Sequence, residues 1–208
     1  MATLALVLYV VYLALAFGLR TVLQVRRTGS TGFHGLGGRP GSAEWLAGVG
    51  FAVALVLGVA APILALVDIV EPIDALDQTC LQVAGTVLAV VGIAATLYAQ
   101  VAMGTSWRIG VDPDERTDLV TTGPFAVVRN PIVAAMIPTA LGLTLLVPSV
   151  VAIAGLVGLA VALELQVRVV EEPYLLRVQG AGYREYAARV GRFLPGVGKL
   201  DRVTEPAS

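Results

Sequence analysis

The chain has 208 residues, of which 57% are hydrophobic and 14% are charged, and its mean hydropathy is +0.83. A soluble domain carries about 25% charged residues, so this composition excludes an ordinary soluble enzyme and indicates an integral membrane protein. The formal net charge of −1 gives no support for nucleic-acid binding. The single cysteine, Cys80, excludes an intrachain disulfide, and with one histidine, His34, we expect no metal site.

Five apolar stretches predict an all-α integral membrane protein with about five transmembrane helices and a cytoplasmic helical extension at the C-terminus. The stretches cover residues 3–19, 45–67, 79–103, 132–147 and 150–167. No Lys or Arg precedes the first stretch, whereas Arg20, Arg26 and Arg27 follow it, which is the reverse of a cleavable signal peptide. The fourth stretch would span only about 24 Å as a helix, less than the ~30 Å hydrocarbon core.

The distribution of charge between these stretches predicts their orientation. Segments 20–44, 104–131 and 168–208 hold nearly all Lys and Arg, whereas segment 68–78 holds four acidic residues and neither Lys nor Arg. Because basic loops stay in the cytoplasm, we expect an N-out, C-in protein, typical of a bacterial inner membrane. A cysteine introduced at Ser30, in a Cys80→Ser background, should react only with reagents on the cytoplasmic side. Labelling from outside would contradict this topology.

The chain divides into an N-terminal part, residues 1–78, and a core, residues 79–208. The N-terminal part comprises two transmembrane helices and the glycine-rich basic segment 20–44, which we expect to be a flexible linker. On the third helix, small residues recur at spacings of three and four, namely Gly85, Ala89, Gly92, Thr96 and Ala99. Such a face favours close packing of another helix, with a ligand groove as the alternative.

Two polar clusters flank the last two apolar stretches. The first is Leu119–Pro131, with the sequence LVTTGPFAVVRNP, and the second is Glu171-Glu172-Pro173-Tyr174. A helical hairpin over 132–167 would place both clusters on the same side of the membrane, with an Arg near two carboxylates. Glu164, Arg168 and Glu171 or Glu172 recur at helical spacing, which predicts one charged face and, as the simplest interpretation, an ion-pair ladder.

The C-terminal tail predicts a short amphipathic helix. Tyr183, Tyr186, Ala187 and Val190 form its apolar stripe, and charged residues occupy the opposite face. Tyrosine on one face and arginine on the other are typical of a helix that lies at the membrane interface.

Taken together, these segments resemble the isoprenylcysteine carboxyl methyltransferase and phospholipid methyltransferase superfamily of integral membrane enzymes. The resemblance covers roughly residues 81–197 and is specific in order and spacing. Its matching segments are Ser106-Trp107, Leu119–Phe125, Arg129-Asn130-Pro131, Glu171–Leu175, Gly182–Tyr186 and Pro195. The first pair stands in reversed order. Asn130 replaces the usual His, and an asparagine can form hydrogen bonds but cannot carry charge or shuttle a proton.

The resemblance implies S-adenosylmethionine as the cofactor and a lipid-like acceptor arriving from the bilayer, such as an isoprenylcysteine-like carboxylate, a thiol or a lipid headgroup. Arg129 and Glu172 are the expected catalytic residues, and no metal is implied. Arg129 suits the carboxylate of the cofactor, and Glu171 or Glu172 suits its ammonium or ribose hydroxyls. The full expected cofactor-binding set is Leu119, Val120, Gly123, Arg129, Asn130, Pro131, Glu171 and Glu172.

Two other functions stay open at this point. Some membrane sterol reductases are similar in their C-terminal halves and use NADPH, although no Lys/Arg cluster suited to a ribose phosphate stands out here. A non-catalytic membrane protein of the same fold is the other, because Asn130 replaces a possible acid or base.

Overall fold

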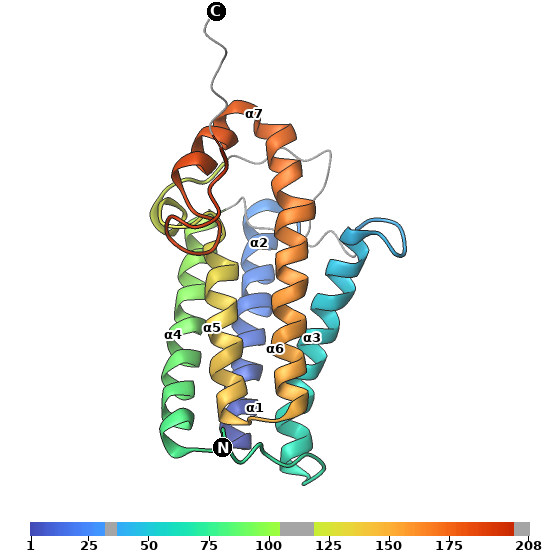
Figure 1. Cartoon of the computed structure of the whole chain (residues 1–208). Coiled ribbons are helices and arrows are strands. Elements are labelled where there is room, and N and C mark those ends of the chain that lie inside the picture. Colours follow the sequence, from blue (N-terminus) through green and yellow to red (C-terminus); the bar gives the residue numbers. More distant parts are fainter. Residues whose placement is uncertain (32–36, 105–118, 202–208) are drawn as a thin grey trace, which may run out of the picture.

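The computed structural model of the chain describes residues 1–31, 37–104 and 119–201. Within these ranges the protein is a helical bundle without β-strands, and its only β pairing is an isolated bridge between Val128 and Gly191 (Figure 1). The elements in chain order are α1 Ala2–Leu13, the π-helix η1 Ala14–Leu19, α2 Arg20–Thr28, α3 Ala43–Leu66, α4 Thr79–Met103, the 3-10 turn η3 Gly123–Ala126, α5 Pro131–Leu146, α6 Val150–Leu165, the π-helix η4 Gln166–Glu171 and α7 Glu172–Arg189.

The predicted all-α membrane fold is confirmed. Four helical stretches in the described residues are long and apolar enough to cross a membrane, and they cover 2–28, 43–66, 79–103 and 150–189. The last of them is kinked at Gly180, whose backbone is not helical. The helix α5 is apolar but has only 16 residues, as expected from the sequence. The chain is therefore an integral membrane protein with a short fourth helix.

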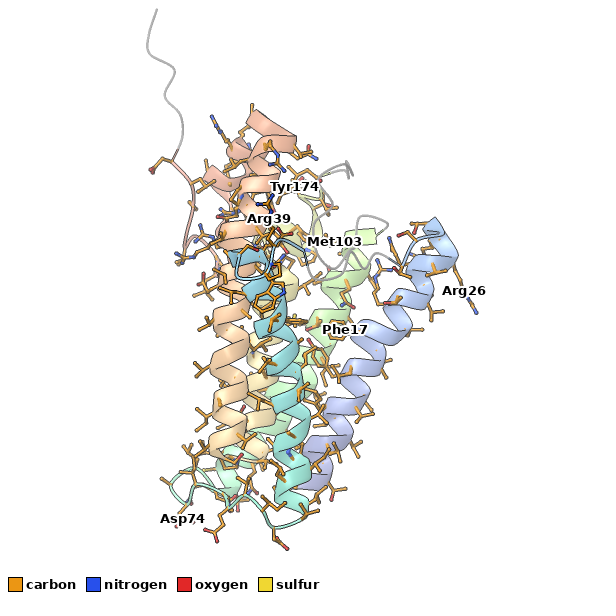
Figure 2. All side chains as sticks on the ribbon, turned by 90° about the vertical axis from the view of Figure 1, so that its right-hand side faces the viewer. Phe17, Arg26, Arg39, Asp74, Met103 and Tyr174 are labelled. Atoms are coloured by element: carbon orange, nitrogen blue, oxygen red, sulfur yellow. The ribbon has the colours of Figure 1, made fainter. Side chains whose placement is uncertain are left out.

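The two ends of the bundle differ in charge. Figure 2 shows Arg26 and Arg39 toward one end, together with Met103 and Tyr174, and Asp74 at the other. We call these the basic end and the acidic end. At the acidic end, the Ile73 N–H donates to the Pro148 carbonyl at 2.7 Å, and the Ser149 hydroxyl caps α6 by accepting from the Ala152 N–H at 3.2 Å. The charge separation predicted from the sequence is thus a property of the fold.

The prediction that segment 20–44 is a linker is wrong for its first nine residues, which form α2 and continue the first helix to Thr28. Arg20 and Gln24 are buried, and the Arg20 guanidinium donates to the Gly104 carbonyl at the end of α4. One turn earlier in the first helix, the Ala16 carbonyl of η1 accepts from the Gln100 side chain of α4 at 2.9 Å. These polar contacts with α4 explain why the helix extends beyond its apolar part. His34 lies outside the described residues.

Helices α4 and α5 pack backbone to backbone through the small-residue face predicted on α4. A Cβ added at Gly142 would lie 2.5 Å from the Ala89 nitrogen and from the Gly85 carbonyl oxygen, and one added at Gly85 would lie 2.7 Å from the Gly142 carbonyl oxygen. Close packing, favoured by the sequence, is confirmed. The alternative of a ligand groove on this face is wrong, because α5 fills it.

The first helix packs against a cluster of side chains from the other helices of the bundle. Its Tyr12 and Ala16 join a buried cluster with side chains from α3, α4, α5 and α6, namely Ala54, Ile93, Met136, Leu159 and Leu163. Tyr9 donates to the Leu55 carbonyl of α3 at 3.1 Å. The cluster fixes the relative position of α4 and α5, whose basic ends carry the loop described below.

The contact between α4 and α5 predicts a large penalty for added volume. Gly142→Ala should destabilise the protein by about 1–3 kcal/mol, because the new methyl group meets backbone atoms that cannot rotate away. Gly18→Ala is the matched control, since a Cβ at Gly18 has no neighbour within 4 Å. Unfolding of the two variants in the same detergent measures the difference. Equal stabilities would contradict the backbone-to-backbone contact.

Candidate functional site

The loop that precedes α5 carries most of the residues predicted from the sequence. Gly123 begins the turn η3 with φ +59°, a left-handed conformation that favours glycine. A Cβ added there would lie 3.9 Å from the Ala102 Cβ and 4.0 Å from the Tyr98 hydroxyl, so the turn lies against the basic end of α4. The buried Phe125 anchors the turn, and Pro131 occupies the first position of α5, where its missing N–H costs nothing.

Arg129 points into the protein and is 5% exposed. Its Nη1 donates to the carbonyls of Ala187 and Val190 at 3.0 and 2.8 Å. Its Nη2 donates to the Glu172 carboxylate at 2.5 Å and to the Gly198 carbonyl at 3.0 Å. Four of the five N–H groups of this guanidinium are therefore bound to the C-terminal part of the chain, while Nε makes no hydrogen bond to any described residue.

Glu172 lies between two arginines and is also 5% exposed. Its Oε1 accepts from Arg129 and from the Arg192 Nε at 2.8 Å, and its Oε2 accepts from the Arg192 Nη2 at 2.8 Å. These hydrogen bonds raise the pKa of the Arg192 guanidinium above its ordinary value, so Arg192 stays charged. The three side chains form a cluster, Arg129–Glu172–Arg192, in which Arg129 and Glu172 are buried and the partly buried Arg192 is the second cation on the carboxylate.

The predicted charged face runs over Glu164, Arg168 and Glu171 or Glu172, and the structure confirms its first pair but excludes Glu172. Glu164 and Arg168 form an exposed pair at 2.5 Å, as the ion-pair ladder requires. Glu172 does not continue the ladder, because the π-helix η4 between Gln166 and Glu171 shifts the helical phase. The carboxylate consequently faces Arg129 inside the protein.

The segment from Val190 to Leu200, which we call the C-terminal strap, closes over this cluster. Gly191 pairs with Val128, and its carbonyl accepts from the Arg129 N–H at 2.8 Å. The Arg192 carbonyl accepts from both the backbone and the side chain of Asn130, at 3.1 and 3.3 Å. Asn130 thus fastens the strap to the start of α5.

The predicted amphipathic helix of the tail is confirmed, but its tyrosine stripe packs on protein, so the prediction that this stripe faces the membrane is wrong. Tyr183, Tyr186 and Ala187 are buried in a cluster that includes Leu119, Leu175 and Leu200. The Tyr186 hydroxyl donates to the Phe125 carbonyl at 2.6 Å. The opposite face is exposed and carries the Arg189–Glu185 pair. The helix α7 is amphipathic because its apolar face packs on the loop before α5.

The structure brings together most of the residues singled out in the sequence. Arg129 and Glu172 are in direct contact, Asn130 and Pro131 follow Arg129, and Glu171 ends η4 next to Glu172. Leu119 packs on the tyrosine cluster, and Gly123 lies at the end of α4. Ser106-Trp107 lies outside the described residues. The described part of the chain holds no group of three or more His, Cys, Asp or Glu that could bind a metal ion.

Sequence reasoning missed Arg192. It follows Gly191, and a Cβ at position 191 would lie 2.8 Å from the backbone nitrogens of both Gly196 and Val197. This glycine lets the strap turn tightly and return Arg192 to Glu172. A glycine-arginine pair just before a Pro-Gly turn is a weak signal in the sequence, and only the fold shows its partner.

Residues 81–181 match a protein-family model described as phospholipid methyltransferase. This part of the chain, from α4 into α7, is similar to the phospholipid methyltransferase family. The match runs from α4 through the Arg129 loop, the α5–α6 hairpin and Glu172, and it ends within α7. It supports a membrane methyltransferase that acts on a lipid-like acceptor. No curated protein and no solved structure matches the chain.

Removing the shared carboxylate should be far more costly than breaking an exposed pair. Glu172→Ala leaves the buried Arg129 without its anion, so we expect a loss of about 3–5 kcal/mol in unfolding free energy. Glu185→Ala breaks the exposed pair with Arg189 and should cost less than about 1 kcal/mol. Denaturant unfolding in detergent measures both. Similar losses for the two variants would show that the cluster contributes no special stability.

Proposed function

We propose that this protein transfers a methyl group from S-adenosylmethionine to a hydrophobic, lipid-like acceptor at the basic end of the bundle. The observation that carries the proposal is the Arg129–Glu172–Arg192 cluster, because it joins the loop before α5 to the helix after α6. Both Arg129 and Glu172 lie inside the segment that matches the family. In this proposal residues 79–208 perform the chemistry, and residues 1–78 support them.

The polar groups that remain in the cluster fit the cofactor. The Arg129 Nε is a buried donor without an acceptor among the described residues, which suits one oxygen of a carboxylate. The Glu172 Oε2 accepts one hydrogen bond and has capacity for another, which suits an ammonium or a ribose hydroxyl. Arg129 and Glu172 therefore serve both as binding groups and as the framework of the site. When bound, S-adenosylmethionine supplies an electrophilic methyl group.

The remaining proposed contacts come from the same loop and helix junction. The backbone of Leu119, Val120 and Gly123 would face the adenine, since the left-handed Gly123 allows close approach. Asn130, Pro131 and Glu171 complete the binding set next to Arg129 and Glu172. By orienting the two substrates, these residues would favour an in-line displacement through proximity, and exclusion of water on binding would add the effect of a low dielectric.

Asn130 restricts the choice of acceptor. Its side-chain amide donates to the Arg192 carbonyl, and an amide is neither protonated nor deprotonated near neutral pH. The site thus offers no base at this position, which favours an acceptor that ionises by itself. We propose a thiol or carboxylate that carries a prenyl or acyl tail, which would reach the site sideways from the bilayer. In the N-out, C-in orientation proposed from the loop charges, the methyl transfer takes place at the cytoplasmic face.

Equilibrium binding to the detergent-solubilised protein tests the cofactor. We expect S-adenosylmethionine to bind and NADPH not to bind, and Glu172→Gln to weaken S-adenosylmethionine binding by about 2 kcal/mol. Glu185→Gln, on the exposed face of α7, is the control and should bind normally. Binding of NADPH in place of S-adenosylmethionine would favour a reductase, and binding of neither would favour a non-catalytic protein.

The tail of the acceptor should govern turnover. Burial of each methylene is worth about 0.8 kcal/mol, so in dilute detergent the rate of methyl transfer should rise with tail length. In bilayers the dependence should flatten, because the tail exchanges one hydrocarbon surrounding for another. Transfer from labelled cofactor to a series of thiols and acids measures the effect. Equal rates for short water-soluble acceptors and for their tailed analogues would reject a lipid-like substrate.

A further inference from the structure

The middle of the C-terminal strap forms an apolar tip that the described residues do not cover. Leu194 and Val197 are 62% and 60% exposed, with Pro195 and Gly196 between them. Across the bridge between Val128 and Gly191, the neighbouring Val127 is 56% exposed. These apolar side chains come from two segments that the bridge joins, and they contribute nothing to the clusters that stabilise α7.

The tip is built as a short fixed turn. The Val197 N–H donates to the Leu194 carbonyl at 3.1 Å, and the Arg192 N–H donates to the Val197 carbonyl at 2.8 Å. Gly196 and Gly198 adopt left-handed conformations on either side of Val197. Below the turn, the ion pair between Arg192 and Glu172 ties the strap to α7. The exposed side chains are consequently presented by a well-connected backbone.

The depth of the tip relative to the membrane follows from the length of α5. The strap pairs with Arg129 and Asn130, the two residues that precede the first residue of α5. Figure 1 shows the strap descending from α7 to the basic ends of α4 and α5. With 16 residues, α5 spans about 24 Å, less than the ~30 Å hydrocarbon core. The start of α5 therefore lies at or below the border of the hydrocarbon, and the tip lies beside it.

We propose that the tip formed by Leu194, Pro195 and Val197, together with Val127, inserts into the lipid bilayer at the boundary between headgroups and acyl chains. The strap that carries the tip pairs with the residues directly before the apolar helix α5, and this continuity with a membrane helix identifies lipid as its partner. Lys199 is exposed on the same strap, where a cation suits the phosphates of anionic headgroups. The proposal rests on the membrane placement of the helices and is independent of the methyl-transfer reaction.

Insertion of the tip has a consequence for the Arg129–Glu172–Arg192 cluster. Arg192 lies between the tip and Asn130, and it supplies two of the three hydrogen bonds that Glu172 accepts. A strap attached to lipid at its tip and to Asn130 through the Arg192 carbonyl holds this arginine against the carboxylate. The bilayer contact thus stabilises the cluster on which the loop before α5 depends.

Spin labels in the full-length protein test the insertion. Leu194→Cys and, separately, Val127→Cys are labelled in a Cys80→Ser background, with Glu185→Cys on the exposed face of α7 as the control. The proteins are reconstituted into vesicles of phosphatidylcholine and phosphatidylglycerol, and collision with oxygen is compared with collision with a water-soluble nickel chelate. We expect the ratio of oxygen to nickel collisions at positions 194 and 127 to be several-fold higher than at position 185.

Two outcomes would overturn the proposal. Frequent collision of the label at 194 with the nickel chelate would place the tip in water. Infrequent collision with both reagents would show a protein contact, such as a second copy of this chain. Circular dichroism of each labelled protein confirms that it is folded, so that a high nickel accessibility reports the position of the tip and not unfolding.

Discussion

The Glu172 carboxylate, bound by two arginines inside the protein, is the interaction on which the basic end of the bundle depends. An isolated ion at such a position would be strongly unfavourable, so each charge requires a partner and its remaining donors require acceptors. Arg129 meets this requirement with Glu172 and with carbonyls at the end of α7, where the helix dipole favours a cation. Because Arg192 belongs to the strap, the same carboxylate unites three segments that are distant in the sequence.

Two π-helical segments make these polar contacts possible. The segment η4 turns Glu172 away from the exposed Glu164–Arg168 pair and toward Arg129. The segment η1 lies where the first helix meets Gln100, and it is followed by the buried Arg20. π-Helical turns inside α-helices are frequent at functional sites because they change the direction of side chains without ending the helix. Here both lie toward the basic end, next to charged residues.

The backbone contact between α4 and α5 explains how a short helix holds its place in the bundle. In a bilayer, small residues allow close approach and dispersion contacts replace the hydrophobic effect between helices. Gly85, Gly92 and Gly142 create such a contact, and it places the start of α5 near the end of α4. The loop from Leu119 to Asn130 is thereby confined between α4, α5 and α7, which is the arrangement the proposed function requires.

The sequence by itself determined the membrane class, the helical stretches and the meeting of Arg129 with Glu172. Apolar length and loop charge are local properties, and a hairpin must return its end to the side where it began. Only the tertiary structure decided which glutamate faces inward. A π-helical segment such as η4 rotates the side chains that follow it, and no residue pattern in the sequence marks its position. It also decided that the tyrosine stripe contacts protein, that α2 continues the first helix and that Arg192 joins the site. These features depend on partners far along the chain, such as Phe125, Gly104 and Glu172, and periodicity within one segment carries no information about them.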